Sequence, residues 1–430
     1  MRVFVELPDD LSTIVNLPPA IDLILPHRAR AGDEVVMLVK GTDPNGHVPQ
    51  LDILNPPANS TFDELLDDKQ IRVLRWQTSD NDTGLHEFRF RVVDAFNASL
   101  TAERSATIEL SSNNDFVRPG PRLRSLAASR DFYVGYASLK DFDVRPDSGI
   151  YTAIATEEFN MVTTENSVKW GEVNPEPNEW RWKSFDKEMQ LAHANGMLMH
   201  GHPLIWHRQL PGWVRELPIH QREGVMLDYI THVITRYGAY VPLWDVVNES
   251  LEEDGTFRQS IWFESMGESY IDKAFEQAAR NAPRSRLLYN DYDVAWEGPK
   301  ADGMYRLVKR LLDEGVPLHG VGFQLHIFTD FDLQDSVRRN FQRFADLGLE
   351  IYVTELDVSL RSGASLEQQA AVYQDIMSLC LEQPACRALQ TWGFTDRYSW
   401  RKQYDPLMFD DDYNTKPAYF TLQQRLSQPD

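Results

Sequence analysis

The amino-acid sequence predicts an α/β protein in which a small all-β sandwich precedes a (β/α)8 TIM barrel. The chain has 430 residues, more than one average domain needs. Its first quarter alternates short runs of β-branched and aromatic residues with turn signals. From about residue 121, eight short apolar runs alternate with helical patterns, as in a barrel of parallel strands. We therefore expect a β module over residues 1–115, a linker and lead-in over residues 116–128, and the barrel over residues 129–430.

The β module is predicted from three runs, "VVMLVKG", "IRVLRW" and "HEFRFRVVDA", which are rich in strand-forming residues. The turn signals "DPNG", "NPPANS" and "SDNDTG" separate them, and several short strands at this spacing are typical of a sandwich. The stretch "GTDPNG…RWQTSDNDTGLHEFRFRVVDAF" also resembles bacterial immunoglobulin- or cadherin-like modules.

Four aspartates of this module, Asp43, Asp80, Asp82 and Asp94, carry oxygen atoms of the type that binds calcium. We favour the simpler interpretation, that they are solvated acids in turns. A calcium-dependent rise in melting temperature would contradict it.

The barrel is predicted from eight strand candidates: "FYVGYAS", "FNMVTTEN", "MLMHGHPLIWH", "LWDVVNE", "RLLYNDY", "GVGFQLH", "EIYVTELDV" and "ALQTWGFTD". Helical stretches such as "SFDKEMQLAHANG" and "SYIDKAFEQAARNAP" lie between them. An open doubly wound sheet is the alternative. We disfavour it because no GxGxxG or GxxxxGK[ST] follows any of these runs.

Polar and aromatic residues follow seven of the eight predicted strands, at the barrel face where active sites gather. In chain order they are Glu165, Asn166 and Lys169; His202 and Trp206; Asn248 and Glu249; Asn290 and Tyr292; Gln324 and His326; Glu355 and Asp357; Trp392 and Trp400. Any one of them alone is explained as an ordinary polar strand end. Seven consecutive strand ends that carry such residues are not explained in this way, so we expect a functional site at this face.

Two glutamates define the chemistry that this face can perform. Glu249 closes "WDVVNE" and Glu355 closes "IYVTE", and two carboxylates across a barrel mouth are what glycoside hydrolysis needs. A catalytic metal is disfavoured, because nothing near His202, His207 and His326 resembles HExxH. A Ser-His-Asp triad lacks its GxSxG elbow. We expect neither metal nor cofactor.

The net charge is −22, and such a surface repels nucleic acid and anionic membranes but suits a neutral substrate. No apolar run approaches the ~18 residues that span a bilayer. We expect no nucleic-acid partner, no membrane-spanning segment and a monomer.

Residues 121–426 resemble glycoside hydrolase family 10, the endo-β-1,4-xylanases. The motifs "FNMVTTENSVKW", "GHPLIWHRQLPGW", "WDVVNES", "NDYD", "GVGFQLH", "VTELDV", "TWGFTDRYSW" and "PLMFDDDYNTKPAY" occur in the family's order. The resemblance implies a retaining hydrolase of xylan and xylo-oligosaccharides. Activity on cellulose-like substrates, which this family sometimes shows, is the alternative within the class. A sugar-binding barrel without catalysis is the alternative outside it, and the presence of both glutamates and His326 argues against it.

The resemblance also implies a role for each site residue. Glu249 resembles the general acid/base, Glu355 the nucleophile, and Asn248 the donor to the sugar 2-hydroxyl. His326, with Asp357 behind it, resembles the pair that orients the nucleophile. The residues that resemble the glycone-binding wall are Glu165, Asn166, Lys169, His202, Trp206, Gln209, Gln324, Trp392 and Trp400. Tyr292 resembles an aglycone platform.

Cys380 and Cys386 are the two cysteines, and their spacing alone fits two free thiols or a local disulfide about equally. The resemblance implies the disulfide and favours a secreted or cell-surface protein. No signal peptide follows Met1, which leaves a cytoplasmic chain or a mature fragment open. Trp76 is the one Trp or Tyr before residue 125, so we expect the β module to have a structural or spacing role rather than to bind xylan.

Overall fold

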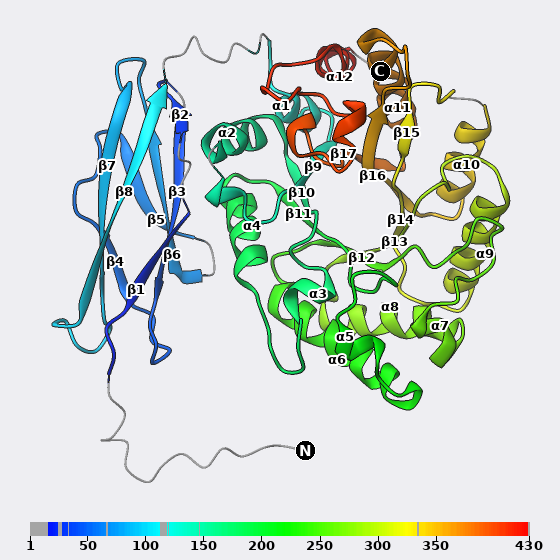
Figure 1. Cartoon of the computed structure of the whole chain (residues 1–430), viewed down its shortest axis with the longest axis horizontal. Coiled ribbons are helices and arrows are strands. Elements are labelled where there is room, and N and C mark those ends of the chain that lie inside the picture. Colours follow the sequence, from blue (N-terminus) through cyan, green and yellow to red (C-terminus); the bar gives the residue numbers. More distant parts are fainter. Residues whose placement is uncertain are drawn as a thin grey trace. The chain divides into compact units, whose positions relative to one another are not determined.

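The computed structural model describes residues 16–24, 28–32, 34–65, 68–111, 118, 120–145, 147–332 and 335–428. The chain divides into two compact units, one built mainly on residues 1–115 and the other mainly on residues 116–430 (Figure 1). Of the predicted linker and lead-in, residues 116–128, the structure describes Arg118 and residues 120–128, and helix α1 (Leu123–Ala128) forms its second half.

The N-terminal unit consists of two four-stranded sheets. One sheet has the order β1-β3-β6-β5 and is antiparallel; the other has the order β2-β8-β7-β4, with β2 parallel to β8. The strands are β1 (Ala20–Ile24), β2 (Arg28–Arg30), β3 (Glu34–Thr42), β4 (Gln50–Ile53), β5 (Ser60–Leu65), β6 (Asp68–Gln77), β7 (Gly84–Val93) and β8 (Thr101–Ser111). The three predicted runs form β3, β6 and β7, so the all-β prediction is confirmed.

The two sheets share one core because their strands alternate apolar and polar side chains. On β7, Phe88, Phe90 and Val92 are buried, whereas Arg89 and Arg91 point to solvent and pair with Glu103. Residues of both sheets complete this core, among them Met37, Leu74, Trp76, Ile108 and Leu110. Trp76 is therefore a core residue.

The second unit is a closed barrel of eight parallel strands (Figure 1). The strands are β9 (Tyr133–Ser138), β10 (Met161–Thr164), β11 (Leu198–Gly201), β12 (Leu243–Asn248), β13 (Arg286–Asp291), β14 (Gly320–Phe323), β16 (Glu350–Ser359) and β17 (Cys386–Thr391). The short strand β15 (His326–Phe328) pairs with the end of β16. All eight predicted strands are confirmed, and the open-sheet alternative is excluded because β17 pairs with β9.

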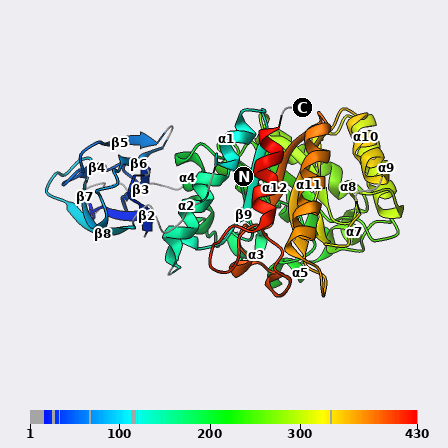
Figure 2. The ribbon, with the colours of Figure 1, turned by 90° about the horizontal axis from the view of Figure 1, so that it is seen from above.

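Helices precede, connect and follow the barrel strands. They are α1 (Leu123–Ala128), α2 (Ser148–Glu158), α3 (Trp170–Val173), α4 (Lys183–Ala194), α5 (Gly212–Arg215), α6 (Ile219–Tyr237), α7 (Ile261–Met266), α8 (Ser269–Asn281), α9 (Pro299–Asp313), α10 (Asp335–Ala345), α11 (Leu366–Glu382) and α12 (Pro417–Ser427). The sequence of α8 shows why they pack on the barrel, since Ile271, Ala274, Phe275 and Ala278 form one buried stripe. Figure 2 shows α11 and α12 side by side on the outside.

The barrel interior changes from apolar to polar along the strands. Its floor is a buried cluster of Met161, Leu243, Leu288, Tyr352 and Ala388. Two residues further along the same strands stand Thr163, Asp245, Asn290, Thr354 and Gln390, all buried. Because strand side chains alternate with a period of two, these polar residues face the same interior. The polar layer supports the mouth above it.

Cys380 of α11 and Cys386 of β17 form a disulfide, so the pairing that the resemblance implied is confirmed. It joins a helix end to the start of a barrel strand, at the face opposite the carboxyl ends. No helix in the described part of the chain is long and apolar enough to cross a membrane.

Candidate active site

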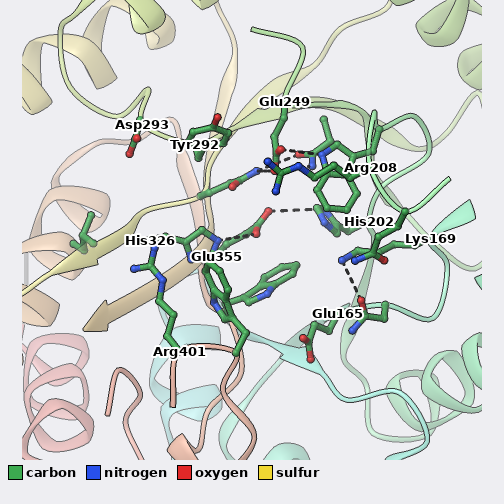
Figure 3. A pocket seen from close by; sticks show the side chains of 18 of the residues that line it. Glu165, Lys169, His202, Arg208, Glu249, Tyr292, Asp293, His326, Glu355 and Arg401 are labelled. Atoms are coloured by element: carbon green, nitrogen blue, oxygen red, sulfur yellow. Dashed lines mark hydrogen bonds and ion pairs between the residues drawn. The ribbon is translucent and has the colours of Figure 1, made fainter. Parts of the chain in front are cut away.

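A cleft with a volume of about 830 Å³ opens at the carboxyl ends of the barrel strands. Of the predicted site residues, those that line it are Glu165, Asn166, Lys169, His202, Trp206, Gln209, Asn248, Glu249, Tyr292, Gln324, His326, Glu355, Trp392 and Trp400. Figure 3 shows Glu249 and Glu355 near its centre, with Glu165 and Lys169 on one side and Tyr292 and Asp293 on the other. The structure thus brings together side chains from seven strand ends.

Glu249 follows the last residue of β12 and has a φ of 55°, in the left-handed region that non-glycine residues rarely adopt. Its Oε2 accepts a hydrogen bond of 2.9 Å from Trp206 Nε1. Its Oε1 accepts from Asn248 Nδ2 and Gln324 Nε2, both at 3.3 Å. Strain of this kind concentrates at functional sites, and here three donors hold the carboxyl group in the cleft.

Glu355 lies within β16, where the pairing with β17 shifts register between Val353 and Leu356. Such a bulge changes the direction of a side chain. It lets Glu355 and Thr354 both contact Asn290, although neighbours in a regular strand point to opposite faces. Burial raises the pKa of Glu355, but the charge of His202 and the hydrogen bond and charge of His326 outweigh it, so the pKa lies below its usual value. Glu355 is therefore an anion at neutral pH.

His326 bridges two carboxylates. Its Nδ1 lies 2.7 Å from Asp357 Oδ2 and its Nε2 lies 3.2 Å from Glu355 Oε2. Burial opposes protonation of His326, but Asp357 and Glu355 overcome it and raise the pKa to about 10. The imidazolium then donates to both acids. Trp400 Nε1 and an Arg401 nitrogen donate to Asp357, at 2.9 and 3.3 Å, so Asp357 supports the site from behind the cleft wall.

Asp245 of β12 holds His202, which follows β11, in the same way. Its two oxygens lie 2.7 Å from His202 Nδ1 and 3.1 Å from His200 Nε2. Burial opposes ionisation of Asp245, but these histidines lower its pKa to about 2. The pairing of β12 with β13 shifts register between Asp245 and Val247, and this places Asp245 and Asn248 on one face. Strand-end reasoning did not find Asp245, because it lies three residues before the end of its strand.

Lys169 lies between aromatic rings on the side of the cleft that carries Glu165. Its Nζ is 5.0 Å from the ring centre of Trp206 and 6.0 Å from that of Trp392, and it donates to Asn166 Oδ1 at 3.2 Å. Burial lowers the pKa of Lys169 despite the opposing charges of Glu355 and Glu165. Amides, acids and ring faces arranged in this way suit the hydroxyls and the C–H faces of sugars.

Sequence reasoning did not find the residues that hold Tyr292, nor several others that line the cleft. The Tyr292 hydroxyl accepts from Arg258 at 3.0 Å, and Lys300 Nζ lies 3.1 Å from its ring centre. The further lining residues are Arg208, Asp293, Trp296, Ile327, Phe328, Asp330, Phe331 and Arg401. Most of them lie in loops beyond the strand ends, so the strand pattern carries no signal for them. The aromatic residues among them were the one available hint.

The architecture and the site resemble those of known sugar hydrolases. A comparison with protein families identifies which family the chain belongs to. Residues 123–425 match the model of glycosyl hydrolase family 10. The chain belongs to this family. The match runs from the start of α1 into α12 and includes all eight barrel strands, so the expectation from the motifs is confirmed.

Relatives within family 10 include endo-1,4-beta-xylanase B of Thermotoga neapolitana, which is 38% identical over 317 residues, 71% of this chain and 92% of the relative. The crystal structure of xylanase 10B from Thermotoga petrophila in complex with xylobiose is 38% identical, with a TM-score of 0.70 over 72% of this chain and 98% of that one. The exoglucanase XynX of Acetivibrio thermocellus is 35% identical over 295 residues, 64% of this chain and 27% of the relative.

Proposed function

We propose that this protein is an endo-β-1,4-xylanase that cleaves xylan with retention of anomeric configuration. The observation that carries the proposal is the placement of Glu249 and Glu355 in one cleft, each held by its own set of hydrogen-bond donors. The xylanase relatives and the xylobiose complex of one of them support xylan as the substrate.

Glu355 attacks first. Its carboxylate forms a bond to the anomeric carbon while Glu249 gives its proton to the departing glycosidic oxygen. The aglycone part of the chain leaves as an alcohol, and the glycone part stays bound to Glu355 as a glycosyl ester. His326, which donates to Glu355 Oε2, keeps the attacking carboxylate ionised and in line.

Water completes the reaction. Glu249, now a carboxylate, takes a proton from a water molecule, which attacks the anomeric carbon and releases Glu355. Trp206 and Gln324 hold the two oxygens of Glu249 in place through both steps. Asn248 is suited to donate to the 2-hydroxyl of the reacting sugar, an interaction that strengthens as positive charge develops at the ring.

The two sides of the cleft bind different parts of the substrate. Glu165, Asn166, Lys169 and the rings of Trp206 and Trp392 bind the glycone sugars. Tyr292 provides a ring surface for the aglycone sugars. A cleft lined on both sides of the glutamates accepts the middle of a chain, which supports endo cleavage.

The deciding experiment measures reducing sugar released from xylan and from carboxymethylcellulose. We expect rapid release from xylan, with xylo-oligosaccharides of several lengths as early products. Proton NMR of the first-formed product is expected to show the β-anomer. An α-anomer formed first would mean inversion, and Glu355 would then activate water instead of attacking the sugar.

Hydrolysis of a β-1,4-glucan is the second candidate, and the relative named as an exoglucanase favours it. The same assay separates the two. A higher kcat/KM on carboxymethylcellulose than on xylan would establish the glucan, and release of single disaccharides from chain ends would establish exo cleavage.

We also propose that the N-terminal unit is an immunoglobulin-like module with a structural or spacing role. Its strand order supports this, with β1, β3, β6 and β5 in the order A, B, E, D and β4, β7 and β8 in the order C, F, G. Its tryptophan, Trp76, is buried and offers no ring for stacking on sugars. Tight binding of residues 1–115 to insoluble xylan would contradict this role.

We further propose that the protein acts outside the cell as a monomer. The disulfide supports an oxidising compartment. The cleft is complete within one chain, so catalysis requires no second copy. Cell fractionation tests the location, and light scattering on the purified protein tests the oligomeric state.

A further inference from the structure

Three potential metal ligands, Asp43, His47 and Asp94, converge in the N-terminal unit. Asp43 follows the end of β3, His47 lies in the turn before β4, and Asp94 follows the end of β7. One ligand atom from each lies within 4.8 Å of the others. The cluster therefore gathers residues next to strands of both sheets. All three precede the barrel and its proposed active site in the sequence.

The side chains of Asp43 and Asp94 are fully buried, with 0% of their surface exposed. The interpretation of the sequence, that these aspartates are solvated turn acids, is wrong for these two. Asp82 is a turn acid in the ordinary sense, since its Oδ2 accepts hydrogen bonds from both the backbone and the hydroxyl of Ser79. Burying two carboxylates so close together is costly unless positive charge compensates them.

Neighbouring groups use only one oxygen of each aspartate. Asp94 Oδ1 accepts from Asn16 Nδ2 at 2.9 Å and from the backbone of Phe96 and Asn97 at 2.9 and 2.7 Å. Asp43 Oδ1 accepts from the backbone of Asn45 at 2.7 Å. The second oxygens are oriented by these bonds and remain available.

Within this cluster, four buried atoms have no hydrogen-bond partner among the described residues: Asp43 Oδ2, Asp94 Oδ2, Asn16 Oδ1 and His47 Nδ1. Three of them can only accept hydrogen bonds, and His47 Nδ1 can accept in its neutral form. These four atoms each carry a free lone pair and belong to residues that contact one another. A bound cation is coordinated by atoms arranged in this way. Protonation of His47 alone would leave Asn16 Oδ1 unsatisfied.

The distances between these atoms fit a shared metal ion better than a hydrogen bond. His47 Nδ1 lies 3.6 Å from Asp43 Oδ1 and 3.6 Å from Asp94 Oδ2. An N–H···O hydrogen bond spans 2.7–3.2 Å, so neither distance is a hydrogen bond. Two ligands of a tetrahedral ion with bonds of about 2.0–2.1 Å lie about 3.4 Å apart. The 3.6 Å between His47 Nδ1 and the unpaired Asp94 Oδ2 is close to that value.

We propose that Asp43, Asp94 and His47 bind a divalent metal ion of the zinc or manganese class, with Asn16 Oδ1 as a fourth ligand. Carboxylates with one imidazole suit these ions, whereas calcium takes oxygen ligands alone. Bound there, the ion links the segment before β1, the β3–β4 turn and the end of β7. Its role is to stabilise the sandwich.

The test uses the full chain, treated with EDTA and dialysed, then titrated calorimetrically with Zn²⁺, Mn²⁺ and Ca²⁺ separately. We expect one Zn²⁺ or Mn²⁺ per chain and a rise in the melting temperature of the N-terminal unit. Each of Asp43→Asn, Asp94→Asn and His47→Ala should weaken binding at least about tenfold. The matched control, Asp63→Asn, changes an exposed acid on β5 and should bind as the wild type does.

Two outcomes would overturn the proposal. The absence of stoichiometric binding by all three ions would remove the site. Calcium binding that His47→Ala leaves unchanged would remove both His47 and the proposed class of ion. If Asp94→Asn fails to fold, Asp43→Asn and His47→Ala still decide, because both residues lie in the turn between β3 and β4.

Discussion

Asn290 donates a hydrogen bond of 2.8 Å from its Nδ2 to Oε1 of Glu355. The same nitrogen donates to Asn248 Oδ1 at 3.0 Å, and Thr354 donates to Asn290 Oδ1. The Asn290 side chain, with both its nitrogen and its oxygen bonded, thus fixes Asn248 and the proposed nucleophile Glu355. We predict that Asn290→Ala lowers kcat on xylan by about 100-fold, the usual effect of losing one oriented donor. Circular dichroism should show a native fold, and wild-type kcat would contradict this role.

Gly322 of β14 makes room for this amide. A Cβ at position 322 would lie 2.2 Å from Asn290 Oδ1, so Gly322→Ala must displace Asn290. We predict a loss of kcat similar to that of Asn290→Ala, measured on xylan. The matched control is Gly224→Ala, in the exposed part of α6, where an added Cβ meets nothing within 4 Å. The control should keep full activity and gain about 0.5–1 kcal/mol of stability.

The two glutamates should fail in different ways. Glu355→Ala is expected to be nearly inactive on every substrate, because no bond to the anomeric carbon can form. Glu249→Ala should still react quickly with an activated aryl xyloside, whose leaving group needs no proton, and then stall as the glycosyl enzyme. Azide should restore turnover and give the β-glycosyl azide, detected by NMR. Equal loss in both variants on the aryl xyloside would refute the separate roles.

His326 should control the pH dependence of the reaction. Its pKa is raised from 6.5 to about 10, so its charge is present through neutral pH and is lost as pH rises through about 10. Its contribution to stability is complete below pH 6.5 and declines between 6.5 and about 10. We predict that His326→Asn raises the pKa of Glu355, shifting the acidic limb of kcat/KM to higher pH. A purely structural role would lower activity without moving that limb.

The disulfide between Cys380 and Cys386 should affect stability and not catalysis. It closes a short loop, for which the chain-entropy estimate is about 2 kcal/mol. We predict that replacing both cysteines by serine lowers the free energy of unfolding by about that amount, measured by urea denaturation. The kcat at 25 °C should not change, because Cys386 begins β17 at the face opposite the cleft. Dithiothreitol should reproduce the effect in the wild type.

Most of the barrel could be predicted because its signals are local. Each strand is a short apolar run, and the polar residue that follows it marks the mouth. Glu249 and Glu355 were found in this way. Asn290 was seen as a strand end, but its contact with both Asn248 and Glu355 depends on how β12, β13 and β16 are aligned. No pattern within one segment reports that alignment.

The sequence by itself determined the two-part organisation, the eight strands and the identity of the two carboxylates, because periodicity and residue type belong to the chain. Only the tertiary structure decided which atoms meet. The bulges in β12 and β16 place Asp245 beside His202 and Glu355 beside Asn290. The packing of two sheets buries Asp43 and Asp94, which the sequence presents as ordinary turn acids. Burial and distance arise between segments, so they appear only when the segments are packed together.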